Sequence, residues 1–135
     1  MAGIERFQQR MRAIPDNVRR ATIPAVITSA QEIADMAEHF APEDTGDLVG
    51  SIGVTGPGQQ TPPYSQPGGS HTVPENGAAV HVGNATVRYP HLQEYGTAHH
   101  AAQPFFWPAY RMLRKRSANR IKRAMARAVK ENWGK

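Results

Sequence analysis

The chain contains no cysteine among its 135 residues, which excludes disulfides, thiol nucleophiles and thiolate metal ligands. It also has no apolar run near the roughly 20 residues that a membrane-spanning helix needs. The first seven residues lack the continuous apolar core of a secretory signal. The absence of cysteine suits a protein made and used in a reducing cytoplasm. The length fits one domain with a single core.

The sequence motifs of several common enzyme classes are also missing. There is no Gly-Lys-Ser/Thr phosphate loop, no Gly-x-Ser-x-Gly elbow and no Gly-x-Gly-x-x-Gly after a strand. The triplet Asp44-Thr45-Gly46 is shared with aspartic proteases, but that chemistry needs two such carboxylates, and dimerisation would have to supply the second. Strand-like apolar runs do not flank the triplet. We therefore predict no catalytic residues and a protein that is not an enzyme.

One cluster of residues raises the alternative of a metal site. His91, Glu94, His99 and His100 lie within ten residues, and two histidines with a carboxylate can bind zinc. The spacing argues against it, because adjacent histidines normally diverge and no His-Glu-x-x-His frame is present. We predict solvated or backbone-bonded histidines, with no metal and no cofactor.

Charge is distributed unevenly along the chain. Residues 111–135 carry ten Lys/Arg and one acid, a net +9, whereas residues 1–110 carry six basic and ten acidic residues, a net −4. A basic segment of this kind contacts either nucleic acid phosphates or an acidic protein surface. The sequence favours a solvated helix or a protein partner, because aromatic residues are not interleaved with the basic ones apart from Trp133. The candidate DNA-facing residues are Arg111, Arg114, Lys115, Arg116, Arg120, Lys122 and Arg123.

Helical periodicity marks both ends of the chain. Apolar residues recur every three or four positions from Ile4 to Val18 and from Val26 to Phe40, which predicts helical structure over residues 1–40. Pro15-Asp16 interrupts the pattern and can start a new helix, because proline is tolerated near a first turn. Pro24 should kink this region or mark a first turn. A second helix is predicted over residues 108–133, opened by Pro108. Its narrow apolar stripe comprises Tyr110, Leu113, Ile121, Met125, Ala128 and Val129.

A small antiparallel sheet is predicted over residues 51–88. Alternating side chains indicate strands at Ser51–Thr55, Ala78–Gly83 and Ala85–Arg88. Between the first two, residues 56–77 hold five prolines and five glycines, so we expect a long, flexible, projecting loop with Tyr64 as its one anchor. The predicted fold class is therefore α+β: a long N-terminal helix, three or four strands and a basic C-terminal helix.

The stretch from Tyr89 to Tyr110 holds six of the ten aromatic residues. Three prolines and one glycine prevent a single helix or strand across it, so residues 89–107 are predicted to be irregular. One short helical turn is expected from Pro90 to Tyr95, ending at Gly96. Aromatic rings gathered in this way need a cover, either a helix of the same chain or a neighbouring subunit.

Three ordered motifs resemble the tail-component family typified by gene product ten of lambdoid long-tailed phages, whose relatives also occur in prophages and gene transfer agents. The first motif is Ala41-Pro42-Glu43-Asp44-Thr45-Gly46-Asp47-Leu48 with Ser51-Ile52. The second is Tyr89 with Glu94-Tyr95-Gly96-Thr97, and the third is Gln103-Pro104-Phe105-Phe106 with Pro108-Ala109. The resemblance spans residues 23–128.

The resemblance implies a structural protein of the virion neck, made in the bacterial cytoplasm, that completes the tail or joins it to the head. It implies a ring, commonly a hexamer, whose partners are connector or head-closure proteins and tail tube or tail terminator proteins. The alternative is a nucleic-acid-binding module that uses the basic C-terminal helix. The expected fold-defining and intersubunit residues are Asp44, Thr45, Gly46, Leu48, Tyr89, Glu94, Tyr95, Gly96, Thr97, Gln103, Pro104, Phe105 and Phe106.

Overall fold

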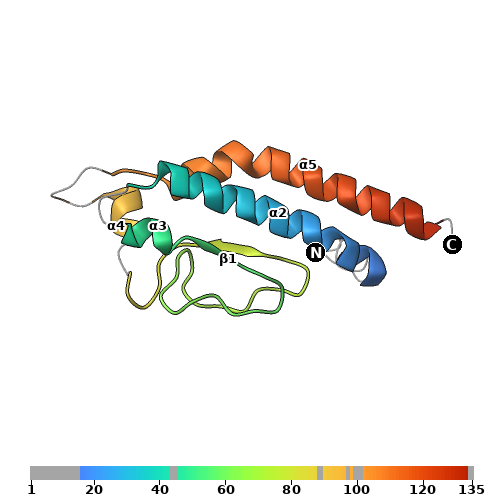
Figure 1. Cartoon of the computed structure of the whole chain (residues 1–135), viewed down its shortest axis with the longest axis horizontal. Helices are drawn as coiled ribbons and strands as arrows, with labels where there is room; N and C mark the ends of the chain where they lie inside the picture. The colour runs from blue at the N-terminus through green and yellow to red at the C-terminus, as the bar shows by residue number, and fades with distance from the viewer. Residues whose placement is uncertain (1–15, 43–45, 88–89, 97, 99–101, 134–135) are drawn as a thin grey trace, which may run out of the picture.

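Two long antiparallel helices run along the length of the molecule (Figure 1). The computed structural model describes residues 16–42, 46–87, 90–96, 98 and 102–133. Its elements are α2 (Asp16–Phe40), α3 (Asp47–Gly50), β1 (Gly53–Thr55), β2 (Ala79–His81), α4 (Pro90–Tyr95) and α5 (Phe106–Trp133). This order confirms an α+β fold with a small antiparallel sheet between the helices in sequence. In the described part of the chain, no helix is long and apolar enough to cross a membrane.

α2 begins where Pro15-Asp16 predicts a helix start, with the acidic Asp16 in the positively polarised first turn. The helix runs through Pro24, so the prediction that this proline marks a first turn is wrong. Pro24 lies on the exposed side of α2, where water can satisfy the carbonyl that loses its backbone partner. Residues 1–15, also predicted to be helical, lie outside the described residues.

The contact between α2 and α5 is the most extensive between any two elements. The side chains buried along it are mostly small, so the two backbones can approach closely. They are Val18, Thr22, Ser29, Ala30, Ile33, Ala109, Leu113, Ser117 and Ala128. The predicted α5 stripe is only partly correct: Leu113 and Ala128 are buried, but Tyr110 and Val129 are exposed, and Ala109 and Ser117 are buried in addition.

The main hydrophobic core lies at one end of the helix pair, where α2 ends and α5 begins. It joins the end of α2, α3, the chain after β2 and the start of α5. Its members are Ala34, Ala37, Ala41, Leu48, Ile52, Val82, Val87, Phe105, Phe106 and Ala109. Phe105 and Phe106 are the only aromatic residues among them, so the packing of this core depends on the positions of these two side chains.

The sheet is smaller than predicted. β1 and β2 pair antiparallel with Val54 opposite Val80, and they are the only two strands in the described residues. The third strand expected at Ala85–Arg88 is wrong for Ala85 to Val87, and Arg88 lies outside the described residues. Asn84 is the cause: its Oδ1 accepts from the N–H groups of Thr86 and Val87, both at 2.9 Å, and closes a turn there.

His81 lies at the end of β2, largely buried beside β1. Its Nε2 lies 2.8 Å from the Thr55 hydroxyl. Burial, with a smaller contribution from the charge of His71, lowers the pKa of His81 below its usual value. Protonation of His81 is therefore less favourable in the folded chain than in the unfolded chain, so stability falls as the pH drops through the usual titration range of histidine.

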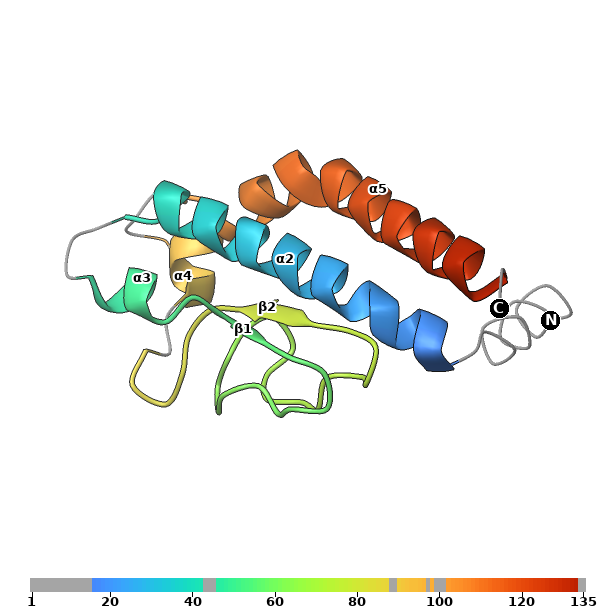
Figure 2. The same ribbon diagram turned by 45° about the vertical axis from the view of Figure 1, so that its right-hand side comes forward.

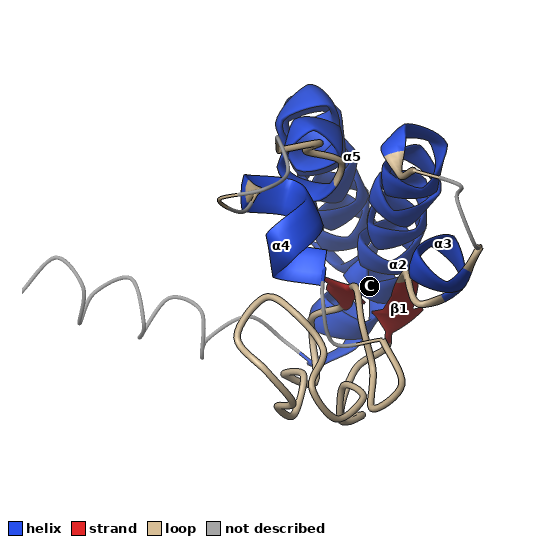
Figure 3. Ribbon diagram, turned by 90° about the vertical axis from the view of Figure 1, so that its left-hand side faces the viewer, coloured by secondary structure: helices blue, strands red, loops and turns tan. Residues whose placement is uncertain are grey.

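Residues 56–77 form an ordered loop rather than the flexible arm that their composition predicts. The loop folds back on itself, with backbone hydrogen bonds from Thr61 to His71 at 2.9 Å and from Val73 to Gln59 at 2.8 Å. Gln66 then pairs with Val82 beside β2. The buried anchors are Thr61, Ser65 and Val73, whereas Tyr64 is 53% exposed. The loop covers the side of the sheet that faces away from α2 (Figures 2 and 3).

Gly83 fixes the chain between β2 and α4. Its φ of 92° is left-handed, and a Cβ atom here would lie 2.9 Å from both Pro90 Cγ and the Val87 carbonyl oxygen. We expect Gly83→Ala to lower the free energy of unfolding by about 2 kcal/mol or more, measured by urea denaturation.

Gly50→Ala is the matched control, because a Cβ at Gly50 meets no atom within 4 Å. Its stability should be unchanged or raised by up to about 1 kcal/mol. Equal stability of the two variants would show that the atoms around Gly83 can accommodate a Cβ atom.

Candidate functional site

The second and third motifs meet at the junction of α4 and α5. α4 is the short helix predicted from Pro90 to Tyr95, and it ends at Gly96, whose φ is 78°. This left-handed conformation costs glycine little, and it turns the chain away from the helix. The predicted end of this helix at Gly96 is therefore confirmed. Tyr89 and Thr97 lie outside the described residues.

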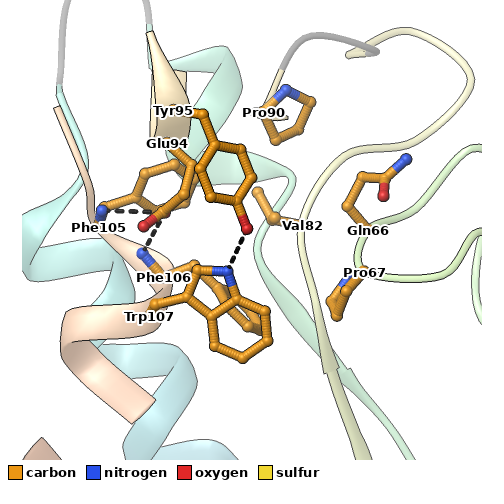
Figure 4. A pocket seen from close by; sticks show the side chains of 9 residues that line it. All are labelled: Gln66, Pro67, Val82, Pro90, Glu94, Tyr95, Phe105, Phe106 and Trp107. Carbon is orange, nitrogen blue, oxygen red and sulfur yellow. Dashed lines mark hydrogen bonds between the residues drawn. The ribbon is translucent and has the colours of Figure 1, made fainter. Parts of the chain in front are cut away.

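The Glu94 carboxylate holds the start of α5 (Figure 4). The residue is 6% exposed, and its Oε1 accepts from the N–H groups of Phe105 at 3.1 Å and Phe106 at 2.8 Å. The first N–H groups of a helix have no acceptor within the helix, and a negative charge is favourable there. This carboxylate explains why α5 begins at Phe106, two residues before the predicted start at Pro108.

The cover for two of the aromatic rings comes from the chain itself. Phe105 is fully buried and Phe106 is 7% exposed, both within the main core. Their side chains therefore stabilise the fold of one chain and are not available to a neighbouring subunit. Gln103 and Pro104, which precede them, are exposed.

A second group of aromatic residues lies on the surface beside this junction. Trp107 Nε1 donates a hydrogen bond to the Tyr95 hydroxyl at 2.8 Å. The Trp107 ring also contacts Tyr110 edge to face, with centroids 5.9 Å apart. Tyr95 is 69% exposed and Tyr110 is 42% exposed. A cavity of about 60 Å³ lies between this group and the loop at Gln66 (Figure 4).

The first motif builds the turn around α3. Gly46 is left-handed, with a φ of 78°, and Leu48 is buried in the core. Ser51 was placed in this motif and at the start of a strand, but β1 begins only at Gly53 and the role of the serine was missed: its hydroxyl donates to the Leu48 carbonyl at 2.7 Å and accepts from Gly83 N–H at 3.1 Å. A serine directly after a short helix was the available signal. Asp44 and Thr45 lie outside the described residues.

The basic residues of α5 divide into two groups. Arg120 binds Glu32 and also donates to the Ser29 hydroxyl at 3.1 Å, while Arg116 Nε lies 3.5 Å from the same carboxylate. A hydrogen bond from Arg120, and then the charges of both arginines, hold the pKa of Glu32 below its usual value. The Arg120 side chain is only 22% exposed because it binds these two residues of α2. It therefore holds α5 against α2 and is not a DNA-facing residue. The exposed basic residues are Arg111, Arg114, Lys115, Arg116, Lys122, Arg123, Arg127 and Lys130.

Two apolar grooves follow the helix pair. The Met112 groove, about 620 Å³, lies between the end of α2 and the start of α5; we define it by Glu32, Asp35, Met36, His39, Phe40, Met112, Leu113 and Arg116. The Tyr110 groove, about 420 Å³, lies where α2, α5 and β2 meet; we define it by Val26, Ile33, Val80, Trp107, Tyr110 and Ile121.

The described residues contain no group of three histidine, aspartate or glutamate side chains placed to hold a metal ion. Glu94, one member of the possible metal set, is instead committed to the backbone of α5. His99, His100 and the His91 side chain lie outside what the structure describes.

Loss of the Glu94 carboxylate should destabilise the chain. Glu94→Ala leaves two buried N–H groups without an acceptor, so we expect a loss of about 2–4 kcal/mol in the free energy of unfolding. Glu94→Gln keeps one acceptor oxygen and should lose about half of that. Urea denaturation followed by circular dichroism measures both. Glu75→Ala, at an exposed acid, should change stability by less than about 0.5 kcal/mol, and a similar value for Glu94→Ala would contradict the capping role.

Comparisons of the chain with protein-family models, with curated proteins and with solved structures gave no significant match. Its function is therefore inferred from its own residues.

Proposed function

We propose that the chain is a structural virion subunit of the head–tail joint, which forms a ring of about six copies between the capsid connector and the tail tube. The observation that carries this proposal is the apolar surface left exposed along the helix pair. Met112 is 64% exposed, Tyr95 69%, Tyr110 42% and Phe40 37%, and each lies in or beside one of the two grooves or the α4–α5 junction. Exposed aromatic residues and methionines are typical of protein interfaces.

The arrangement of the motifs supports a structural role. Glu94 of the second motif binds the backbone at Phe105 and Phe106 of the third motif, so the two form one unit. Inside that unit the phenylalanines pack in the core, while Tyr95, Gln103 and Pro104 remain on the surface. The same motifs thus fix the fold and present side chains that a neighbour can contact.

The charge distribution is compatible with this position in a virion. Eight exposed Lys/Arg residues lie on α5, whereas residues 1–110 carry a net charge of −4. In a ring each subunit presents one surface to a different surface of the next, and unlike charges favour such contacts. If α5 faces the lumen, the same charges would contact DNA in transit. The partners would be connector or head-closure proteins on one side and tail tube or tail terminator proteins on the other.

The oligomeric state tests the proposal. We expect light scattering at low and moderate salt to give a mass of about six times the 14.8 kDa of one chain. Electron microscopy of the same sample should show closed rings. A monomer at every concentration and salt level would contradict assembly as a property of this chain.

The basic helix supports a second candidate function, a nucleic-acid-binding module. We expect double-stranded DNA to be retarded in about 50 mM salt and released by about 200 mM, because phosphate contacts release counterions. Replacing the exposed Arg114, Lys115, Lys122 and Arg123 with glutamine should abolish the retardation. Arg127→Gln with Lys130→Gln is a smaller change on the same helix and should reduce it only partly. If retardation changed neither with salt concentration nor with these substitutions, binding through α5 would be excluded.

A further inference from the structure

We propose that residues 1–14 of one copy bind in the Met112 groove of the next copy. The inference rests on the proposed ring and names the contact that joins its neighbours. It combines the chemistry of the groove, the pattern of the N-terminal sequence and the distance between the two along the chain.

The groove is an apolar surface with charged edges. Phe40 is 37% exposed and Met112 is 64% exposed, and they flank the more deeply placed Met36 and Leu113. In the described residues no element covers these side chains. Burying them would remove apolar surface from water at about 25 cal/mol per Å². The groove therefore fits an occupant that presents a short row of apolar side chains.

The two edges of the groove differ in charge. On the α2 edge are Glu32 and Asp35, and Asp35 Oδ1 accepts a hydrogen bond from the Gln31 side chain at 2.9 Å. Glu32 is occupied by the two arginines of α5, so Asp35 is the carboxylate available on this edge. On the α5 edge is Arg116, whose side chain is 64% exposed. An occupant should therefore carry a basic flank towards α2 and an acidic group towards α5.

The first 14 residues have the apolar row and the basic flank. Ile4, Phe7, Met11 and Ile14 are spaced by three and four, so in a helix they form one apolar stripe. At 100° per residue, Arg6 and Arg10 fall on one flank of that stripe, whereas Glu5 and Arg12 fall on the other and together carry no net charge. Arg10 can then face Asp35. This pairing sets which flank of the segment faces α2.

A helix formed by residues 1–14 would be too short to reach the groove of its own copy. A helix of 14 residues is about 21 Å long. Met36 and Phe40 lie 20 and 24 residues beyond Asp16 in α2, which is about 30 and 36 Å at 1.5 Å per residue. A helical segment attached to its own Asp16 therefore ends before it reaches the groove. Since the segment is joined to the start of α2 and the groove lies at the end of α2, the contact repeats head to tail and can close into a ring.

Two full-length variants test the contact. Phe7→Glu with Met11→Glu disables the segment, and Met112→Glu disables the groove, where the side chain is exposed and folding should be unaffected. We expect each variant to be a monomer by light scattering. An equimolar mixture retains one functional segment and one functional groove per pair, so it should form 1:1 dimers and nothing larger.

The matched control is Val129→Glu, at an apolar residue that is 44% exposed near the other end of α5. It should assemble like the unmodified chain, and equal thermal unfolding temperatures for all variants would show that each is folded. A charge exchange tests the orientation: Asp35→Arg should weaken association at least about tenfold, and adding Arg10→Glu should restore it.

The outcomes separate this inference from the proposed function. Rings that persist in both variants would overturn the segment–groove contact and leave the ring intact. If the unmodified protein forms open-ended oligomers and each variant is a monomer, the result would support the contact and contradict a closed ring. A mixture of the two variants that contains only monomers would overturn the contact between copies.

Discussion

The hydrogen bonds from the backbone of Phe105 and Phe106 to the Glu94 carboxylate are the interaction on which the rest of the structure depends. They satisfy N–H groups that a helix start leaves without acceptors, and so they set where α5 begins. That position places Phe105 and Phe106 in the core and leaves Tyr110 on the surface. A shift of α5 by one residue would rotate it by about 100° and bring different side chains to α2.

Small side chains at the α2–α5 contact impose a second constraint. Because Ala, Ser and Thr dominate it, the helices approach closely, and the two large buried rings lie at one end. A chain of this size cannot bury the apolar side chains on the outer flanks of two long helices with a two-stranded sheet. Phe40, Tyr110 and Met112 therefore stay partly exposed as a consequence of the fold. In the proposed ring, a neighbouring copy would cover them.

Features encoded within a few residues were predictable from the sequence. The start of α2 at Asp16, the short α4 and the left-handed Gly96 depend on local spacing and backbone preference. Features that depend on distant partners were not. Residues 56–77 order through backbone pairs such as Thr61 with His71, which composition does not reveal. Arg120 resembles its basic neighbours in sequence, and only its partial burial against Glu32 and Ser29, 88 and 91 positions away, separates it from them.

Charge on α5 also limits how copies can associate. A two-fold contact through this helix would place its exposed face against itself, with eight Lys/Arg residues on each side. Like charges held together in an interface cost several kcal/mol, so association through that face is disfavoured. Apolar contacts are available instead at the two grooves, beside this basic face. Copies that meet through a groove on one molecule and a different surface on the next keep their basic faces apart. Such unlike contacts are the kind that build rings, and they leave the basic face of every subunit open to phosphate or to an acidic partner.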